Sequence, residues 1–132
     1  SVDATLLASV NTSDTAVVAS MTTHGRKPPS DGMAFDCSGR LFYGDLTGSA
    51  LLGWSPALSF GATSDAIVVA QSDETLRWVD TFAFDDEGGL LLTTNKLDRY
   101  FLRTMDFTGA GGPNFRILRF AVGTHSYLAG PC

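Results

Sequence analysis

Residues suited to acid–base or nucleophilic chemistry are few in this 132-residue sequence. Its two histidines are His24, within "THGRKPP", and His125, close to the C-terminal end. We expect both to lie in solvated loops. Neither stands in a nucleophile motif such as G-x-S-x-G or in the zinc motif H-E-x-x-H. The sequence therefore offers no candidate catalytic residue.

Two carboxylates occupy matching positions and are the sharper candidates for binding. Asp31 opens "DGMAFD" and Asp80 opens "DTFAFD". Carboxylates that converge from several segments are the ligands that Ca²⁺ prefers, so Asp31 is a candidate metal ligand. The alternative is that Asp31 caps a turn and Asp80 hydrogen-bonds a neighbouring repeat unit, or blade, of the fold. We favour this alternative, and Ca²⁺ stays a secondary hypothesis.

The two cysteines, Cys37 and Cys132, allow three arrangements. They could form an intrachain disulfide, one of them could bond to another chain, or both could be free thiols. A disulfide is expected only if the protein is secreted. The triplet "NTS" at Asn11 is a glycosylation acceptor under the same condition.

Composition narrows the class of protein. The net charge is −5 and no basic cluster is present, which argues against nucleic acid and anionic membranes as partners. The apolar runs have the length of strands and fall short of the roughly 20 residues of a membrane helix. Short runs of Val, Thr and aromatic residues between Gly-containing turns favour an all-β fold.

An internal repeat supplies the elements that must position these residues. The stretch "SDGMAFDCSGRLFYGDL" matches "VDTFAFDDEGGLLLTTN" at a constant offset of 49 positions, with Asp31 on Asp80 and Gly39 on Gly88. In each "FDxxG" step the Asp accepts backbone hydrogen bonds, and the Gly supplies the positive φ of a tight turn. Strands are expected at 31–36, 41–45, 49–54 and 66–71, with the separator 55–64 before the last of them, and again 49 residues later. Four antiparallel strands that repeat at this spacing are typical of a β-propeller blade.

The repeat also predicts how the chain is organised. Residues 29–75 and 78–122 would each form a complete blade, and residues 123–132 a C-terminal tail. Projecting the repeat backwards makes 1–24 the second half of another blade. About two and a half blades cannot close a ring of four to eight. The first residue is Ser1, so we expect upstream processing, with the ring completed by another chain or by the N-terminal part of a cleaved precursor. A bridge from Cys132 could join the two pieces.

The first strand of each blade lines the central channel of a propeller. A channel with apolar walls and a few polar groups can bind a small apolar or aromatic molecule. The candidate channel residues are Asp31, Met33, Trp78, Asp80 and Phe82.

The sequence resembles the yellow/major royal jelly protein family over residues 29–118. The resemblance rests on "SDGMAFDCSGRLFYGDL", "LLGWSP", "DDEGGLLLTTNKL" and "NFRIL". It implies a six-bladed propeller that is secreted and often glycosylated, of which this chain would be the C-terminal part.

The function that this resemblance favours is a secreted, non-catalytic carrier. The ligand would be a sterol, a biogenic amine or a polyene pigment such as a carotenoid, held in or near the channel. One alternative is an enzyme, either a calcium-dependent lactonase-like hydrolase or a dopachrome-converting enzyme. Another is a structural or storage protein. The partners expected are a second chain that supplies the remaining blades and the small ligand itself.

Overall fold

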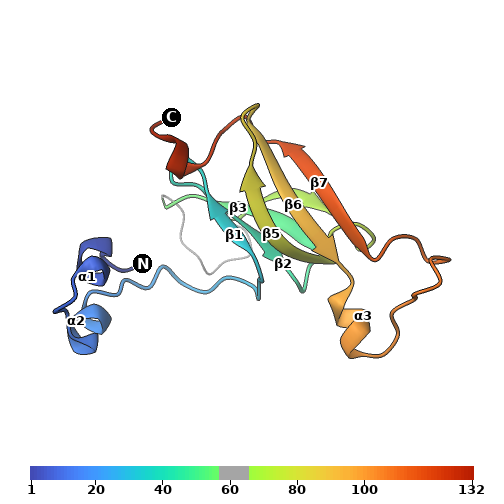
Figure 1. The fold of residues 1–132 in the computed structure, drawn as a ribbon, viewed down its shortest axis with the longest axis horizontal. Coiled ribbons are helices and arrows are strands. Elements are labelled where there is room, and N and C mark those ends of the chain that lie inside the picture. The colour runs from blue at the N-terminus through green and yellow to red at the C-terminus, as the bar shows by residue number, and fades with distance from the viewer. Residues whose placement is uncertain (57–65) are drawn as a thin grey trace.

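The computed structural model describes residues 1–56 and 66–132, and these residues build two antiparallel β-sheets with a few short helices (Figure 1). Among the described residues, no helix has the length and apolar character needed to cross a membrane. In chain order the elements are α1 (Ala4–Ala8), α2 (Asp14–Ala19), β1 (Met33–Phe35), β2 (Leu41–Asp45), β3 (Ala50–Trp54), β4 (Ile67–Gln71), β5 (Trp78–Phe84), β6 (Gly89–Asn95), α3 (Leu97–Phe101), β7 (Phe115–Ala121) and the 3₁₀ turn η1 (Tyr127–Ala129).

The first sheet confirms the four-stranded unit predicted from the repeat. Its order is β1-β2-β3-β4, and every neighbouring pair is antiparallel. Met33 pairs with Tyr43, and Leu41 pairs with Trp54. Each strand begins within two residues of its predicted start. Of the predicted separator 55–64, residues 57–64 lie outside the described residues.

The second sheet has three strands in the order β5-β6-β7, so the prediction of a third strand near residues 98–104 is wrong. The helix α3 stands there, because the Asn95 side chain accepts a hydrogen bond from the Leu97 amide at 2.9 Å and starts a helical turn. Asp98 in the first turn and Arg99 in the last suit the helix dipole. The strand β7 therefore pairs directly with β6, with Leu92 opposite Leu118.

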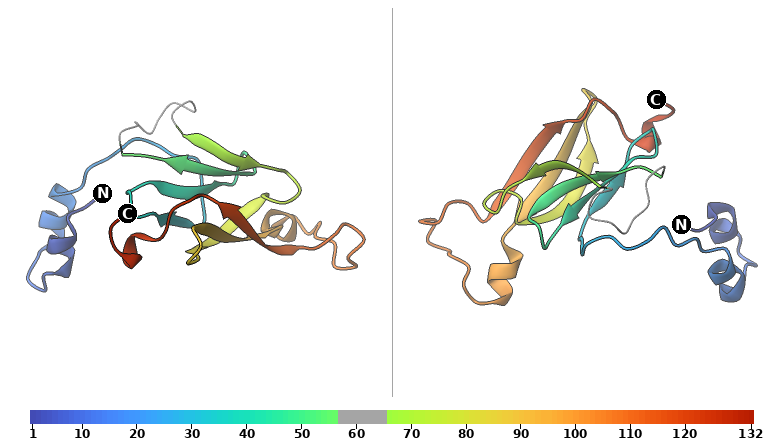
Figure 2. Two further views of the ribbon diagram at one scale, coloured as in Figure 1. Left: turned by 90° about the horizontal axis from the view of Figure 1, so that it is seen from above. Right: turned by 180° about the vertical axis from the view of Figure 1, so that it is seen from behind.

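The N-terminal residues also differ from expectation, because they form helices where two strands of a half-blade were predicted. The Asp3 side chain accepts from the Thr5 amide at 2.8 Å, and Ser13 accepts from the Ala16 amide at 3.3 Å. These caps start α1 and α2, whose alanine and leucine residues favour helix. Neither helix has a buried residue, and the pair stands apart from the sheets in each view (Figures 1 and 2).

The core lies between the two sheets, which face each other in Figure 2. Side chains from both sheets form it: Phe42, Leu51, Leu76, Val79, Leu90 and Leu92 are buried, with Phe82, Leu118 and Phe120 packed against them. The other face of the first sheet carries a second cluster that includes Leu41, Tyr43 and Trp54. The segment before β1 covers part of that face, with the Lys27 ammonium 5.5 Å from the Tyr43 ring centre and the His24 ring 5.8 Å from Trp54.

The predicted Asp–Gly turn occurs in both units with the same hydrogen bonds. Asp36 accepts from the amides of Ser38 and Arg40 at 3.0 and 2.8 Å. Asp85 accepts from the amides of Glu87 and Gly89 at 3.0 and 2.7 Å. Both turn glycines, which precede these last amides by one position, have φ of +79°. The two copies of the sequence repeat therefore form turns with the same hydrogen bonds and the same glycine conformation.

The two turn carboxylates also carry an arginine each, and this affects their titration. Burial opposes ionisation of Asp36, but hydrogen bonds from Ser38 and Arg40 and the charge of Arg40 outweigh it, so its pKa lies below the usual value. In the second turn, hydrogen bonds from Arg119 and from the Gly89 and Glu87 amides lower the pKa of Asp85 to about 2.

Replacing the fully buried Asp36 with Asn is expected to lower the free energy of unfolding at pH 7 by roughly 1.5–3 kcal/mol, because charge-assisted hydrogen bonds are lost. A carboxyl with a depressed folded-state pKa stabilises the fold above its unfolded pKa of about 3.9. That contribution disappears as pH falls through the folded-state pKa, so the wild type and the Asp36→Asn variant should converge in stability below about pH 4. Urea denaturation across pH 2–8 measures this, and the control is Asp86→Asn, which changes an exposed carboxylate of the second Asp–Gly turn. A constant difference at every pH would contradict the role given to the charge.

Candidate functional site

The first strands of the two sheets, β1 and β5, lie against each other and bring the predicted channel residues together. The Trp78 indole Nε1 donates a hydrogen bond to the Asp31 carboxylate at 2.8 Å. Gly32 lies so close to Asp80 that a Cβ added at Gly32 would stand 1.6 Å from the Asp80 carbonyl oxygen. The contact between neighbouring blades at this position therefore requires glycine.

The five candidates divide by what surrounds them. Asp31 is exposed and bonded to Trp78, and Met33 is about half exposed on the free side of β1. Asp80 accepts a hydrogen bond from the Asn95 amide nitrogen at 3.1 Å. Phe82 packs against the core between the sheets, so its ring serves packing. Both carboxylates accept hydrogen bonds, but not the predicted ones. Asp31 bonds Trp78 of the neighbouring sheet instead of capping a turn, and Asp80 bonds Asn95 within its own sheet instead of a neighbouring blade.

A groove of about 460 Å³ opens beside Asp80, on the face of the second sheet that points away from the core. Its polar lining includes Asp80, Asn95 and Arg116 with two threonines, Thr93 and Thr94, and its apolar lining is Phe115 and Ile117. These two side chains are 72% and 78% exposed, although both stand on a strand. Apolar contact area beside a carboxylate and an amide suits a small apolar molecule that carries a polar group.

A second, larger groove of about 560 Å³ lies between α3 and the loop that follows it. It is lined by Tyr100, Phe101, Arg103, Met105 and Phe107. The Phe101 ring also meets the Trp78 ring edge to face, with 6.3 Å between ring centres. Aromatic contact therefore extends from the Asp31–Trp78 pair at the inner strands to the helix.

The residues of "TNKL" and "NFRI" hold this loop in place. Asn95 bonds both Asp80 and the start of α3. The buried Lys96 ammonium donates to the Gly111 carbonyl at 2.9 Å, and the Asn114 side chain donates to the Asp106 carbonyl at 2.7 Å. Arg116 donates to the carbonyls of Glu74 and Pro113 at 3.1 Å each. The two motifs thus shape the walls of both grooves.

Sequence reasoning missed most of these groove residues, for two reasons. Tyr100 and Phe101 were read as part of a strand, which hid the aromatic face of α3. For Phe115 and Ile117 a signal was present, because "FRILRFA" alternates and its first and third residues fall on the face opposite the core residue Leu118.

Metal ligation by the carboxylates finds little support in this part of the chain. Neither Asp31 nor Asp80 belongs to a group of three or more potential metal ligands within residues 1–56 and 66–132. In the "DDEG" turn, Asp85 and Glu87 instead contact the Arg119 guanidinium at 2.6 and 3.4 Å. A Ca²⁺ role for Asp31 stays a prediction.

The two cysteines are bonded to each other. Cys37, beside the first Asp–Gly turn, joins Cys132 across 95 positions of sequence, with 5.2 Å between the Cα atoms. This is the intrachain arrangement among the three that the sequence allowed. His24 is exposed and contacts the Ser1 hydroxyl at 2.9 Å. His125 lies in a loop, as predicted, and is half-buried beside the disulfide.

Comparison with known proteins gives one clear match. A family model described as major royal jelly protein matches residues 1–127. Among curated proteins, no match was found.

Proposed function

Because this chain belongs to the major royal jelly protein family, we propose that it is a secreted, non-catalytic carrier of a small lipophilic or aromatic molecule. The family fold is a β-propeller, and the two antiparallel sheets described above are part of such a ring. The observation that carries the proposal is the groove beside Asp80, which pairs exposed Phe115 and Ile117 with a carboxylate and an amide.

The chemistry of the groove defines the ligand class. Burial of Phe115 and Ile117 against a ligand removes apolar surface from water, which drives binding. Asp80 and Asn95 then orient a polar group of that ligand. An aromatic amine would place its ammonium at Asp80, whereas a sterol would use its hydroxyl, and a polyene pigment would depend on apolar contact alone.

Further blades would close the groove. Two sheets cannot form a ring, and the second sheet presents Phe115 and Ile117 on its open face. We propose that blades from a second chain, or from another part of a cleaved precursor, cover this face and wall the groove. Because Cys37 and Cys132 are bonded to each other, neither of them would form a disulfide with the chain that supplies those blades.

Secretion is the compartment that the chemistry favours. A disulfide persists in oxidising surroundings outside the cytosol. Asn11 is exposed in the turn between α1 and α2, where an oligosaccharide would meet no obstacle from the sheets. Native mass spectrometry of the purified protein reports a glycan on Asn11 and any bound small molecule in one experiment.

Binding of three probes, tryptamine, cholesterol and β-carotene, tests the proposal. Each probe is titrated into protein purified from its natural source and into recombinant protein. Ile117→Asn should lower the affinity for a probe that binds by about tenfold, which corresponds to roughly 1.4 kcal/mol of lost apolar contact. Ile67→Asn is the matched control, because Ile67 is a similarly exposed isoleucine on β4, outside the groove. Asp80→Asn should lower the affinity for tryptamine far more than the affinity for cholesterol.

Three results would contradict the carrier proposal. One is that none of the probes binds and mass spectrometry of the isolated protein finds no small molecule. Another is that Ile117→Asn and Ile67→Asn have equal effects, which would place binding elsewhere. Conversion of a bound probe to product would instead support an enzyme.

A further inference from the structure

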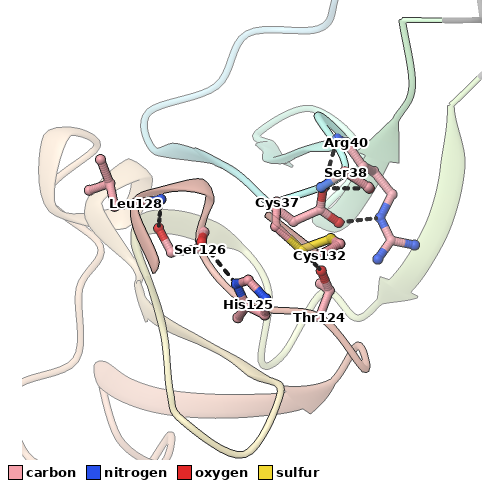
Figure 3. Close-up of a disulfide and its surroundings, with 9 residues drawn as sticks. Cys37, Ser38, Arg40, Thr124, His125, Ser126, Leu128 and Cys132 are labelled. Carbon is pink, nitrogen blue, oxygen red and sulfur yellow. Dashed lines mark hydrogen bonds and ion pairs between the residues drawn. A yellow bond between two sulfur atoms is a disulfide. The ribbon is translucent and has the colours of Figure 1, made fainter. Parts of the chain in front are cut away.

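His125 lies beside the Cys37–Cys132 disulfide, and the three side chains form a cluster with the donor set of a metal site (Figure 3). The two sulfur atoms and one ring nitrogen all lie within 4.8 Å of one another. Around a tetrahedral Zn²⁺, with metal–ligand bonds of about 2.0–2.3 Å, ligand atoms stand roughly 3.3–3.8 Å apart. Once the sulfur–sulfur bond is broken, the two sulfur atoms must separate to about 3.8 Å, which rotation of the two cysteine side chains can supply.

The backbone holds these residues in register independently of the disulfide. The Cys37 amide donates to the His125 carbonyl at 2.9 Å, and Asp36 and Ser126 form an antiparallel bridge. On the other side, the Gly123 amide donates to the Gly88 carbonyl at 2.9 Å. Reduction thus leaves several contacts that keep the segment with His125 near Cys37.

A hydrogen bond to the backbone can set the imidazole in the tautomer that a metal ligand requires. His125 Nδ1 lies 3.1 Å from the Ser126 carbonyl oxygen, which can only accept, so Nδ1 carries the proton of that hydrogen bond. Nε2 then keeps its lone pair for a metal, and the bond to the carbonyl fixes the ring orientation, as is usual for metal-binding histidines. The Thr124 hydroxyl, 3.3 Å from the Cys37 sulfur, adds a polar group at the edge of the cluster.

We propose that Cys37, Cys132 and His125 form a Zn²⁺ site in the reduced protein, in place of the disulfide. A small thiol reductant reaches the exposed Cys132 first. The thiolate of the reductant attacks the Cys132 sulfur, releases Cys37 and forms a mixed disulfide with Cys132. A second reductant thiol then attacks this mixed disulfide and releases Cys132. Two reductant thiols are thereby oxidised to one disulfide, and Cys37 and Cys132 become thiols by gaining two electrons and two protons. Zn²⁺ then displaces both thiol protons and binds two thiolates and the neutral imidazole, with water as the fourth ligand.

Cobalt titration tests the site, because Co²⁺ occupies zinc sites and its thiolate complexes absorb in the near ultraviolet. The whole protein is reduced with a phosphine, freed of reductant without air and titrated with Co²⁺ and then Zn²⁺. We expect one equivalent of Co²⁺ with a thiolate charge-transfer band, displaced by Zn²⁺, and no band in the disulfide form. His125→Ala should weaken binding about tenfold or more. His24→Ala, which removes the other histidine, should leave the affinity unchanged.

Each other outcome overturns the proposal. The absence of the band in reduced protein, or equal cobalt affinities for His125→Ala and wild type, would show that the cluster is no metal site. Comparing Co²⁺ binding by folded and by unfolded protein distinguishes a built site from adventitious thiol binding, and circular dichroism verifies that each sample is folded or unfolded. If the reduced protein unfolded by urea binds Co²⁺ as tightly as the folded one, the fold contributes nothing and the proposal fails.

Discussion

Replacing Gly32 with Ala is expected to lower the free energy of unfolding by roughly 3 kcal/mol or more. The added Cβ would stand 1.6 Å from the carbonyl oxygen of Asp80 and 2.6 Å from its carbonyl carbon. Both are backbone atoms of β5, so no side-chain rotation relieves the overlap. The inner edges of the two sheets must move apart.

Gly53→Ala is the matched control for this variant. Gly53 also lies in a strand of the first sheet, but a Cβ there would meet its nearest atom at 3.6 Å, an ordinary contact distance. We expect its stability to stay within about 1 kcal/mol of the wild type. Urea denaturation of both variants measures the difference, and equal stabilities would show that β1 and β5 are not in contact in solution.

The Gly32→Ala substitution should also disturb the candidate site. If β1 moves away from β5, the hydrogen bond between Trp78 and the Asp31 carboxylate lengthens, although neither residue has been changed. The emission of Trp78 should then shift, measured in a background in which Trp54 is replaced by Phe. This readout separates a displaced inner edge from a general loss of stability, because it is made under conditions where the variant is still folded.

The strands could be predicted from the sequence because local chemistry and the repeat agree there. In both units an Asp accepts amide hydrogen bonds across a tight turn, a Gly takes positive φ, and alternating side chains follow. These signals act over only a few residues. Each of the seven strands within residues 1–56 and 66–132 therefore has a signal in the sequence.

The errors arose where the repeat was extended beyond such turns. Projection by 49 positions placed strands at the N-terminal residues, although Asp3 and Ser13 are good helix caps and stand directly before alanine-rich segments. The same projection placed a third strand near residues 98–104, but the Asn95 side chain accepts from the Leu97 amide where a helix begins. Local side-chain hydrogen bonds, from Asp3 and Ser13 at the N-terminal residues and from Asn95 before α3, favour helix where the projection placed strands.

The candidate site was predicted in part. The inner-strand position brought Asp31 and Trp78 together although 47 residues separate them, because they occupy neighbouring blades. The partner of Asp80, Asn95, and the aromatic face of α3 could not be found without the helix. The disulfide could not be chosen among its alternatives either, since Cys132 approaches Cys37 only after the chain has completed both sheets.

Removing the disulfide is the other change from which we expect a large loss of stability. The bond joins residues 95 positions apart, and in the chain-entropy model a closed loop of this size stabilises the fold by up to about 4–5 kcal/mol, while measured values are typically about 2–4 kcal/mol. The loop contains every strand of the two sheets except β1, so the unfolded chain loses much of its freedom when the bond is present. The C-terminal segment around η1 contains no buried residue, and it should also become sensitive to protease.

Variants of the two cysteines test the pairing without further controls. If Cys37 and Cys132 bond to each other, then Cys37→Ser, Cys132→Ser and the double variant each remove the same bond, and their losses should be equal. The remaining thiol of each single variant is alkylated before urea denaturation. Losses that add in the double variant would show that the cysteines act separately. A non-reducing gel on which the wild type migrates at twice the mass of the single variants would show that one of them bonds to another chain.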